Sequence, residues 1–429
     1  MGHRFLFVSH YGSSLDLAWQ LRKEGAEVRF HIQSKPDRDV GDGFVEKTED
    51  WQAQQDWAET VVFDDVGDGA LCEKLRASGK AVLGGAAYAD RLELDRDFGQ
   101  QEMQAAGMTV LPSWDFEGPG AFDQAAAYVR AHPDRYVVKP NGKAQSEKVL
   151  SFVGQEEDGR DVAETLAFYK RGWGAKIRGF QLQKFASGVE VAIGAYFNGR
   201  EFVLPAHVNF EHKKLFNGDI GPSTGEMGTS GFWCGEIPLV KETVLRFRER
   251  LAACGFTGYF DLNCIASHRG IVPLEATCRF GYPTLNLQLD GVLSKWSDFL
   301  PALARGQAFP LRTKRGFQVA VVVAVPPFPF EDPAAFHKYS GDAAVIFKRE
   351  LHEGLHPCDV KLVDGDWRLA GCSGYALVFT GSASTMLDAR KETYARVRQV
   401  VIPNMFYRTD IGERWMRDGD LLQSWGFLG

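Results

Sequence analysis

The first 85 residues alternate short apolar segments with amphipathic ones, and this alternation restricts the fold more than any other feature. Short segments rich in β-branched residues predict strands, whereas apolar residues three and four positions apart predict helices. Strands and helices in regular alternation build a parallel, doubly wound sheet. We therefore predict strands at Arg4–Ser9, Val28–Ile32, Thr60–Phe63 and Ala81–Leu83, with helices at Ser14–Glu24 and Leu71–Ala77.

The turn after the first predicted strand argues against a dinucleotide site. A Rossmann fingerprint needs glycines at fixed places in this turn, where the backbone must approach a pyrophosphate. Here the turn reads Ser9-His10-Tyr11-Gly12-Ser13-Ser14, with a single glycine. We predict the doubly wound fold without NAD.

The remainder of the chain is predicted to form two further units. The three expected domains are residues 1–85, residues 86–310 with a smaller lobe at about 115–185, and a β-rich unit at residues 311–429. The glycine-rich segment Asn217–Gly231 is expected to be an irregular loop, because glycine loses more backbone entropy than other residues in regular elements. Further helices are predicted at Leu92–Ala106, Ala121–Ala131, Lys241–Cys254 and Thr385–Arg398, and strands at Tyr136–Lys139, Gln181–Phe185, Val189–Phe197, Val203–Asn209, Gly258–Ala266 and Gly270–Ala276.

Charge, cysteine usage and hydropathy exclude several classes of protein. The net charge of −7 predicts no general affinity for nucleic acid or anionic membrane surfaces. The seven cysteines are scattered and contain no Cys-x-x-Cys pair, which disfavours a disulfide framework or a structural zinc site and favours the cytoplasm. No segment approaches the roughly 18 apolar residues of a membrane span.

A predicted hairpin of strands carries acidic residues at 258–276 and just beyond. Asp261 lies on one strand, and Glu275 and Thr277 lie on the next, where alternation places them on one face. Carboxylates on neighbouring strands suit Mg²⁺ bound with nucleotide phosphates, and Arg279 could neutralise phosphate charge. A solvated row of charged side chains is the alternative reading of the same residues.

Basic residues follow several predicted strands. Lys139 ends an apolar strand, and the turn after it adds Lys143 and Lys148. A lysine at this point could reach a nucleotide phosphate, or simply lie in solvent at a hairpin tip. The run from Glu211 to Lys214 leads into the glycine-rich segment, where positive charge beside backbone amides would suit an anion.

Taken in order, these motifs resemble the phosphoribosylamine–glycine ligase (glycinamide ribonucleotide synthetase) family of the ATP-grasp superfamily. The motif HKKLFNGDIGPSTGEMGT at 212–229 is similar to a family loop that reads His-Lys-Arg and then Thr-Gly-Pro-Asn-Thr-Gly-Gly-Met-Gly. LEATCRFGYP at 274–283 is similar to Glu-Phe-Asn-Cys-Arg-Phe-Gly-Asp-Pro. VVKPNG at 137–142 and RTDIG at 408–412 match two shorter family motifs.

The resemblance implies an ATP-grasp fold, with an N-terminal doubly wound domain and a C-terminal β-rich domain, that uses ATP and Mg²⁺ or Mn²⁺. It implies catalytic roles for Arg279 and Lys213. It also implies a nucleotide site made of Arg96, Lys139, Lys148, the hinge residues Gln183 and Phe185, the ribose-binding Glu190 and the adenine-floor Leu274, and a metal site made of Glu275, Asp261 and Thr277.

The sequence departs from the family on the amine side. The family's first strand leads to Gly-Asn-Gly-Gly-Arg-Glu-His, whereas this chain has SHYGSSLD at 9–16. Thr277 and Tyr282 replace an asparagine and an acidic residue, and the flap at 143–148 lacks glycines. We therefore expect a cytoplasmic carboxylate–amine ligase, a monomer or a homodimer, that joins glycine or another small amino acid to an amine through an acyl phosphate. The purine-pathway ligase itself and an inactive nucleotide-binding scaffold are the alternatives.

Overall fold

The computed structural model describes residues 2–141, 150–174, 177, 179–330 and 332–429. Its N-terminal region is a five-stranded sheet in which every neighbouring pair is parallel, as predicted. Helices α1 (Leu15–Lys23) and α2 (Gly69–Ala77) connect its strands. The strand order is β3 (Glu46–Lys47), β2 (Glu27–Ile32), β1 (Arg4–Ser9), β4 (Thr60–Phe63) and β5 (Ala81–Leu83).

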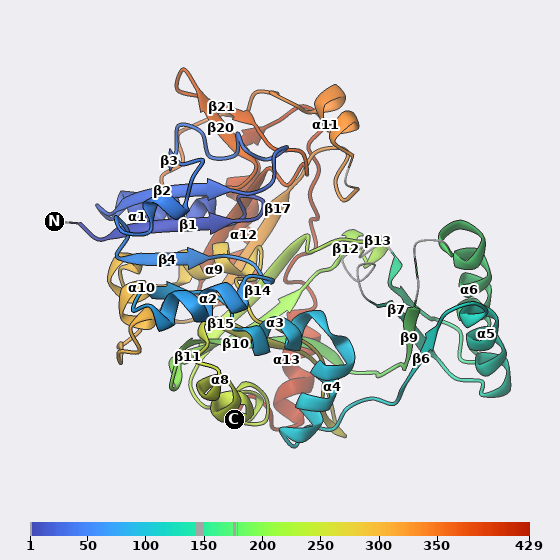
Figure 1. Cartoon of the computed structure of the whole chain (residues 1–429). Coiled ribbons are helices and arrows are strands. Elements are labelled where there is room, and N and C mark those ends of the chain that lie inside the picture. Colours follow the sequence, from blue (N-terminus) through green and yellow to red (C-terminus); the bar gives the residue numbers. More distant parts are fainter. Residues whose placement is uncertain (1, 142–149, 175–176, 178, 331) are drawn as a thin grey trace.

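An antiparallel sheet of eight strands forms the centre of the molecule (Figure 1). Its strands β17 and β22 come from the region beyond residue 310 and pair through β14 with the strands of the middle region. The division at residue 310 therefore stays a proposal, and the central sheet runs across it. The order is β16 (Gly270–Thr277), β15 (Thr257–Ser267), β10 (Val189–Asn198), β11 (Phe202–Glu211), β14 (Gly228–Cys234), β17 (Phe317–Val323), β22 (Leu377–Ala383) and β19 (Leu355–Pro357).

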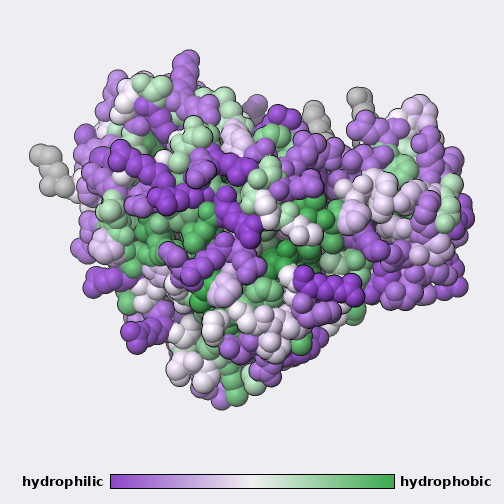
Figure 2. All heavy atoms as spheres, turned by 90° about the horizontal axis from the view of Figure 1, so that it is seen from below, coloured by the Kyte–Doolittle hydropathy of each residue, from purple (hydrophilic) through white to green (hydrophobic). Residues whose placement is uncertain are grey.

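A separate lobe projects beside the central sheet, to the right in Figure 1. Two helices, α5 (Ala121–Ala131) and α6 (Arg160–Trp173), pack on its four-stranded sheet and close a hydrophobic core of their own. Viewed from below, the outer surface of this lobe is predominantly hydrophilic (Figure 2). We call it the clamp lobe, and its strand order is β6 (Ser113–Glu117), β9 (Gly179–Lys184), β7 (Tyr136–Pro140) and β8 (Phe152–Val153).

The connection between β14 and β15 consists of three short helical segments, and the remaining helices lie elsewhere along the chain. Between β14 and β15 lie α7 (Pro238–Lys241), a 3₁₀ turn at Val244–Phe247 and α8 (Arg248–Ala253), so the predicted continuous helix at Lys241–Cys254 was wrong. Thr243, whose backbone angles of φ −121° and ψ −100° are not helical, interrupts it. The remaining elements are α9 (Thr284–Gly291), α10 (Trp296–Ala304), α11 (Pro333–Tyr339), β18 (Ile346–Phe347), β20 (Val360–Val363), β21 (Asp366–Leu369), α12 (Met386–Val397), β23 (Val400–Val401) and α13 (Trp415–Ser424).

Two other predicted elements also differ from the structure. The helix predicted at Leu92–Ala106 is two helices, α3 (Ala87–Leu94) and α4 (Arg96–Ala105), because Asp95 is extended and its carboxylate caps α4 by accepting from the Phe98 amide. The glycine-rich segment is not irregular, since β13 (Ile220–Ser223) pairs with β12 (Lys214–Phe216) and β14 continues the central sheet. Gly218 and Gly221 supply the positive φ angles of the hairpin.

Across the described residues, each helix is too short or too polar to traverse a bilayer.

Candidate active site

Lys213 lies among three carboxylates that come from three strands of the central sheet. Its Nζ is 3.0 Å from Glu190 Oε1, 3.1 Å from Glu211 Oε2 and 3.7 Å from Glu275 Oε1. Burial alone would lower the pKa of Lys213, but the three carboxylates outweigh it and hold that pKa well above its usual value. Lys213 also holds the pKa of Glu190 below its usual value, although burial opposes this shift. The group is therefore charged throughout the neutral range.

The register of β15 and β16 places the predicted metal ligands on one face. Asp261 lies opposite Thr277, and Asn263 lies opposite Glu275. Asp261 is 4% exposed, and its Oδ1 atom has no hydrogen-bond partner within the described part of the chain. Burial raises the pKa of Asp261 well above its usual value, and Glu211 and Glu93 raise it further. A buried, unpaired carboxyl oxygen is the kind of group that a bound cation would satisfy.

Oxygen donors on this face fit a divalent cation that is shared with a ligand. Glu275, Asp261 and Thr277 offer two carboxylates and a hydroxyl, which are the hard ligands that Mg²⁺ prefers. Among the residues that the structure describes, no group of three or more His, Cys, Asp or Glu side chains could hold a metal ion by itself. Mg²⁺ commonly takes one or two carboxylates and completes its shell with water and phosphate oxygens, so these residues would suffice when ATP is present.

Two cations face this site from the clamp lobe and from α4. Lys139, on β7, donates a hydrogen bond of 2.8 Å to Gln183 Oε1 on the neighbouring strand β9. Burial lowers the pKa of Lys139 to about 7, with Arg96 and Lys213 adding to the shift and Glu275 opposing it. The Nε atom of Arg96 is buried without a partner in the described structure. Two basic groups that act on each other in this way suit an anionic ligand.

The predicted adenine-binding residues are distributed over two walls. Gln183 is 1% exposed on β9, and the ring of Phe185 stacks against the guanidinium of Arg135 at 3.7 Å. On the opposite wall, the carbonyl of Leu274 accepts a hydrogen bond of 2.9 Å from Gln100. Lys148 and the rest of the predicted flap at 143–148 lie outside the described residues.

Arg279 points away from the three carboxylates and toward the N-terminal sheet. Its Nε lies 3.3 Å from Asp65 Oδ1 and 3.2 Å from Glu93 Oε1, and a second nitrogen donates to the carbonyl of Phe280 at 2.8 Å. Burial opposes its charge, but Glu93 and Asp65 raise the pKa of Arg279. The structure therefore separates Arg279 from Lys213, the other predicted catalytic residue.

Four residues that lie at or beside this site were not predicted as site residues from the sequence: Glu211, Asn263, Glu93 and Asp65. Glu211 stood in a run read only for its positive charge, and Glu93 stood in an ordinary amphipathic helix. One signal was available for Asp65, because it directly follows β4, and ligands bind at the carboxyl ends of parallel strands.

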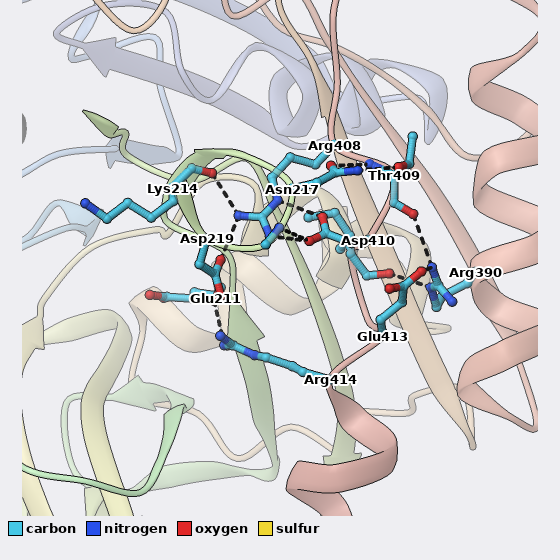
Figure 3. A network of polar contacts seen from close by, with 12 residues as sticks. Glu211, Lys214, Asn217, Asp219, Arg390, Arg408, Thr409, Asp410, Glu413 and Arg414 are labelled. Carbon is cyan, nitrogen blue, oxygen red and sulfur yellow. Dashed lines mark hydrogen bonds and ion pairs between the residues drawn. The ribbon is translucent and has the colours of Figure 1, made fainter. Parts of the chain in front are cut away.

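The C-terminal segment ties down the hairpin that follows Lys213 (Figure 3). Arg408, 1% exposed, donates to the Lys214 carbonyl at 2.9 Å, to Asp219 at 2.8 Å and to both carboxylate oxygens of Asp410. Asn217 donates to Thr409 at 2.6 Å. The glycine-rich segment that was predicted to be an irregular loop is therefore anchored at its first turn.

A second polar cluster is buried away from the site. His356 Nδ1 lies 2.6 Å from Asp16 Oδ2, and its Nε2 lies 2.7 Å from Thr380 Oγ1. The geometry resembles a nucleophile–histidine–acid arrangement, but all three residues are less than 10% exposed and Thr380 is fully buried. The cluster joins α1 to β19 and β22 and has a structural role.

Comparisons with known proteins agree with this geometry. Residues 95–284 match the family model described as phosphoribosylglycinamide synthetase, ATP-grasp (A) domain. Phosphoribosylamine–glycine ligase of Listeria monocytogenes is 27% identical over 357 residues, covering 80% of this chain and 81% of the relative, and that of Neisseria meningitidis is 27% identical over 373 residues, covering 83% and 85%.

Solved structures share the fold over the full chain. The phosphoribosylamine–glycine ligase of Thermotoga maritima superposes with a TM-score of 0.69 at 23% identity, covering 95% of this chain and all of that one. Biotin carboxylase of Campylobacter jejuni superposes with a TM-score of 0.63 at 11% identity, covering 99% and 97%. The predicted ATP-grasp fold is thereby confirmed.

Proposed function

Because the chain belongs to the ATP-grasp superfamily, with an ATP-grasp domain of the phosphoribosylglycinamide synthetase family, we propose that it is an ATP-dependent carboxylate–amine ligase. Its acid substrate is glycine or another small amino acid, which the enzyme activates as an acyl phosphate before an amine attacks it. The curated relatives are named ligases of this carbon–nitrogen type.

The contacts of Lys213 are the observation that supports the proposal most directly. Three carboxylates from β10, β11 and β16 converge on one ammonium group, while Lys139 is hydrogen-bonded to the neutral Gln183 and Arg96 acts on Lys139 as a second cation. Such an arrangement suits a polyphosphate bound between the cations and a divalent cation bound to the carboxylates. Glu190 would then exchange Lys213 for the ribose hydroxyls of ATP.

The residues have distinct roles in this mechanism. Glu275, Asp261 and Thr277 would hold Mg²⁺ or Mn²⁺, which when bound neutralises phosphate charge. Lys139 and Arg96 orient the phosphates, and Gln183 positions Lys139 through its hydrogen bond. An oxygen of the amino acid carboxylate attacks the γ-phosphorus, and ADP leaves with the electron pair of the broken P–O bond. Lys213, released from Glu190, stabilises charge on the transferred phosphoryl group.

Two alternatives follow from particular observations. The curated relatives are named phosphoribosylamine–glycine ligases, which favours the same amine for this chain. Thr277, a weaker metal ligand than the asparagine expected by resemblance, favours a scaffold that binds nucleotide without turnover.

Trapping of the acyl phosphate by hydroxylamine tests the proposal independently of the amine. We expect the full chain with ATP, Mg²⁺, glycine and hydroxylamine to release ADP and form glycine hydroxamate. The variant Lys213→Met should lose at least about a hundredfold in this activity, because it removes the charge that stabilises the transferred group. Lys391→Met, at an exposed ion pair on α12, is the matched control and should leave the rate unchanged. ATP binding without hydroxamate from glycine or other small amino acids would support the scaffold instead.

A further inference from the structure

Three buried oxygen atoms beside the proposed ATP and metal site have no role in it so far. They are Oε1 of Glu226, Oδ1 of Asn209 and Oδ1 of Asn263, and each lacks a hydrogen-bond partner within the described part of the chain. The three residues are at most 5% exposed. A buried polar atom that is left unpaired costs free energy, so several such atoms in one place indicate that a ligand supplies the missing partner.

The register of the central sheet brings the two asparagines to one face. Asn209 on β11 and Asn263 on β15 both lie opposite Ala192 of β10, which stands between them. Asn263 also lies opposite Glu275, so this is the face that carries the proposed metal site. The side chain of Ala192 is small enough for Asn263 to lean across β10, where its Nδ2 donates to Glu211 Oε1 at 3.5 Å.

The hydrogen bonds of the two amides show that their unpaired atoms are acceptors. The hydroxyl of Thr229 donates to the carbonyl of Phe210 at 3.3 Å, so its oxygen accepts from Asn209 Nδ2 at 3.2 Å. The carboxylate of Glu211 can only accept from Asn263. In each asparagine the amide nitrogen is therefore the paired atom, and the oxygen is the unpaired one.

Glu226 joins this group from the segment that leads into β14. The hydroxyl of Thr229 is a hydrogen-bond partner of its carboxyl group as well as of Asn209, which places the two side chains together. Burial and the charge of Glu211 raise the pKa of Glu226 well above its usual value, although Lys213 opposes the shift. A cation bound beside Glu226 would lower that pKa again, because an opposite charge favours the ionised form.

The three oxygens adjoin the place where the acyl phosphate is expected to form. Glu211 joins the two places, because its Oε1 accepts from Asn263 and its Oε2 lies 3.1 Å from Lys213 Nζ. An α-amino acid has one carbon between its carboxylate and its ammonium group, so the sites that bind these two groups must be neighbours. A set of acceptors suits a group that only donates, and an ammonium ion is such a group.

We propose that Glu226, with the amide oxygens of Asn209 and Asn263, binds the ammonium group of the acid substrate and so selects amino acids over hydroxy acids. This inference rests on the proposed ligase function and names the residues that determine the specificity for its acid. Glu226 departs from the motif of the related ligases, which reads Thr-Gly-Gly-Met-Gly and has glycine at this position. The carboxylate of the acid would then lie toward Lys213, where it is phosphorylated.

Pairs of acids that differ only in the ammonium group test the proposal on the full chain. The pairs are glycine with glycolate, alanine with lactate and β-alanine with 3-hydroxypropionate, each with ATP, Mg²⁺ and hydroxylamine as the nucleophile. We expect kcat/KM for hydroxamate formation from the best amino acid to exceed that from its hydroxy acid by at least about a hundredfold, because a hydroxyl replaces a charged donor. Equal values within every pair would overturn the inference.

A variant of Glu226 assigns this preference to its carboxylate. Glu226→Gln keeps the shape of the side chain, and we expect the KM for the amino acid to rise about tenfold or more with little change in kcat and no change for the hydroxy acid. Glu236→Gln is the matched control and should change neither value, because Glu236 is exposed just after the same strand β14. An unchanged KM for the amino acid in Glu226→Gln, or equal losses for both acids of a pair, would contradict the proposal.

Calorimetric titration of the acids into the chain with ADP and Mg²⁺ separates this inference from the ligase function. Binding of an amino acid at least about tenfold tighter than its hydroxy acid, weakened in Glu226→Gln, would support the inference even without turnover. Absence of hydroxamate with every acid would in that case count against ligation alone. Equal binding within every pair, or binding of none of the acids, would overturn the inference.

Discussion

The two sides of the site carry opposite patterns of charge. On the clamp side, Lys139 donates to the neutral side chain of Gln183 on the neighbouring strand, and Arg96 is near enough to lower the pKa of Lys139. On the N-terminal side, Arg279 is held by two carboxylates, and further carboxylates surround it. The lysine of the first pattern is hydrogen-bonded to a neutral side chain, whereas the arginine of the second is held by carboxylates. The residues proposed to bind ATP and the adjoining edge of the N-terminal sheet therefore present different electrostatic surfaces.

The largest effect is expected from Glu275, the carboxylate of β16 that is proposed to act in the use of ATP. Glu275→Gln keeps the size of the side chain but removes a charge that lies beside Lys213 and that the proposed metal site would use. We expect the rate of ADP release to fall by about three orders of magnitude or more, because metal-assisted phosphoryl transfer depends on this neutralisation. A variant with unchanged turnover would contradict the metal assignment. Asp388→Asn, in an exposed ion pair on α12, controls for the loss of one carboxylate.

The pH dependence of ATP use tests the clamp side. Lys139 has a pKa of about 7, lowered first by burial, so its charge is lost as the pH rises through 7. Because kcat/KM reports the free enzyme, we expect kcat/KM for ATP to fall about tenfold per pH unit above that value. Lys139→Arg should keep kcat/KM nearly constant between pH 7 and 9, since guanidinium stays protonated. A wild-type profile that is flat up to pH 9 would show that Lys139 does not contact the nucleotide.

The lowered pKa of Lys139 also makes the free energy of unfolding depend on pH. The folded-state pKa of Lys139 is lower than the unfolded value, so between about pH 7 and the ordinary lysine value the unfolded chain binds more protons. The contribution of this group to the free energy of unfolding therefore rises with pH through that window. Comparing unfolding of the wild type with Lys139→Met across pH 7–10 isolates the contribution. The opposite slope would contradict the burial of a neutral amine.

The tether at Arg408 tests whether the position of Lys213 depends on the C-terminal segment (Figure 3). Arg408→Met removes the guanidinium that pairs with Asp410 and Asp219 and frees the carbonyl of Lys214. We expect the free energy of unfolding to fall by about 3 kcal/mol. We also expect kcat to fall about fivefold at a temperature where the variant is folded, because Lys213 directly precedes the tethered residue. Arg160→Met, in an exposed pair with Glu156, should change the free energy of unfolding by less than about 0.5 kcal/mol.

Sequence patterns predicted the groups that lie within one strand or hairpin. Lys139 and Gln183 sit on neighbouring strands, and alternation alone placed Glu275 and Thr277 on one face. Glu211, by contrast, joins the site only because β11 pairs with β10, and Asp65 reaches Arg279 across more than 200 residues of sequence. Contacts of this kind depend on tertiary packing, which local periodicity does not encode.

The glycine-rich hairpin shows a second reason why the sequence did not predict the whole structure. Its composition predicts an irregular loop, yet β12 and β13 pair there because Asn217 and Asp219 bind a segment that lies about 190 residues later in the chain. The helix break at Asp95 had a local signal, since aspartate is a preferred N-cap residue. A single sequence contains no comparable local signal for the hairpin.

The smallest expected effect concerns Thr277, where the two sides of the site meet. Thr277→Asn replaces a hydroxyl by an amide oxygen, which Mg²⁺ accepts more readily, while Thr277→Val removes the oxygen and keeps the branched shape. We expect the Mg²⁺ concentration for half-maximal ADP release to fall about threefold in the first variant and to rise in the second. If asparagine gives no improvement, Asp261 on the facing strand already completes the metal site, because the two residues are directly paired. The threonine at this position would then be neutral for binding of the metal.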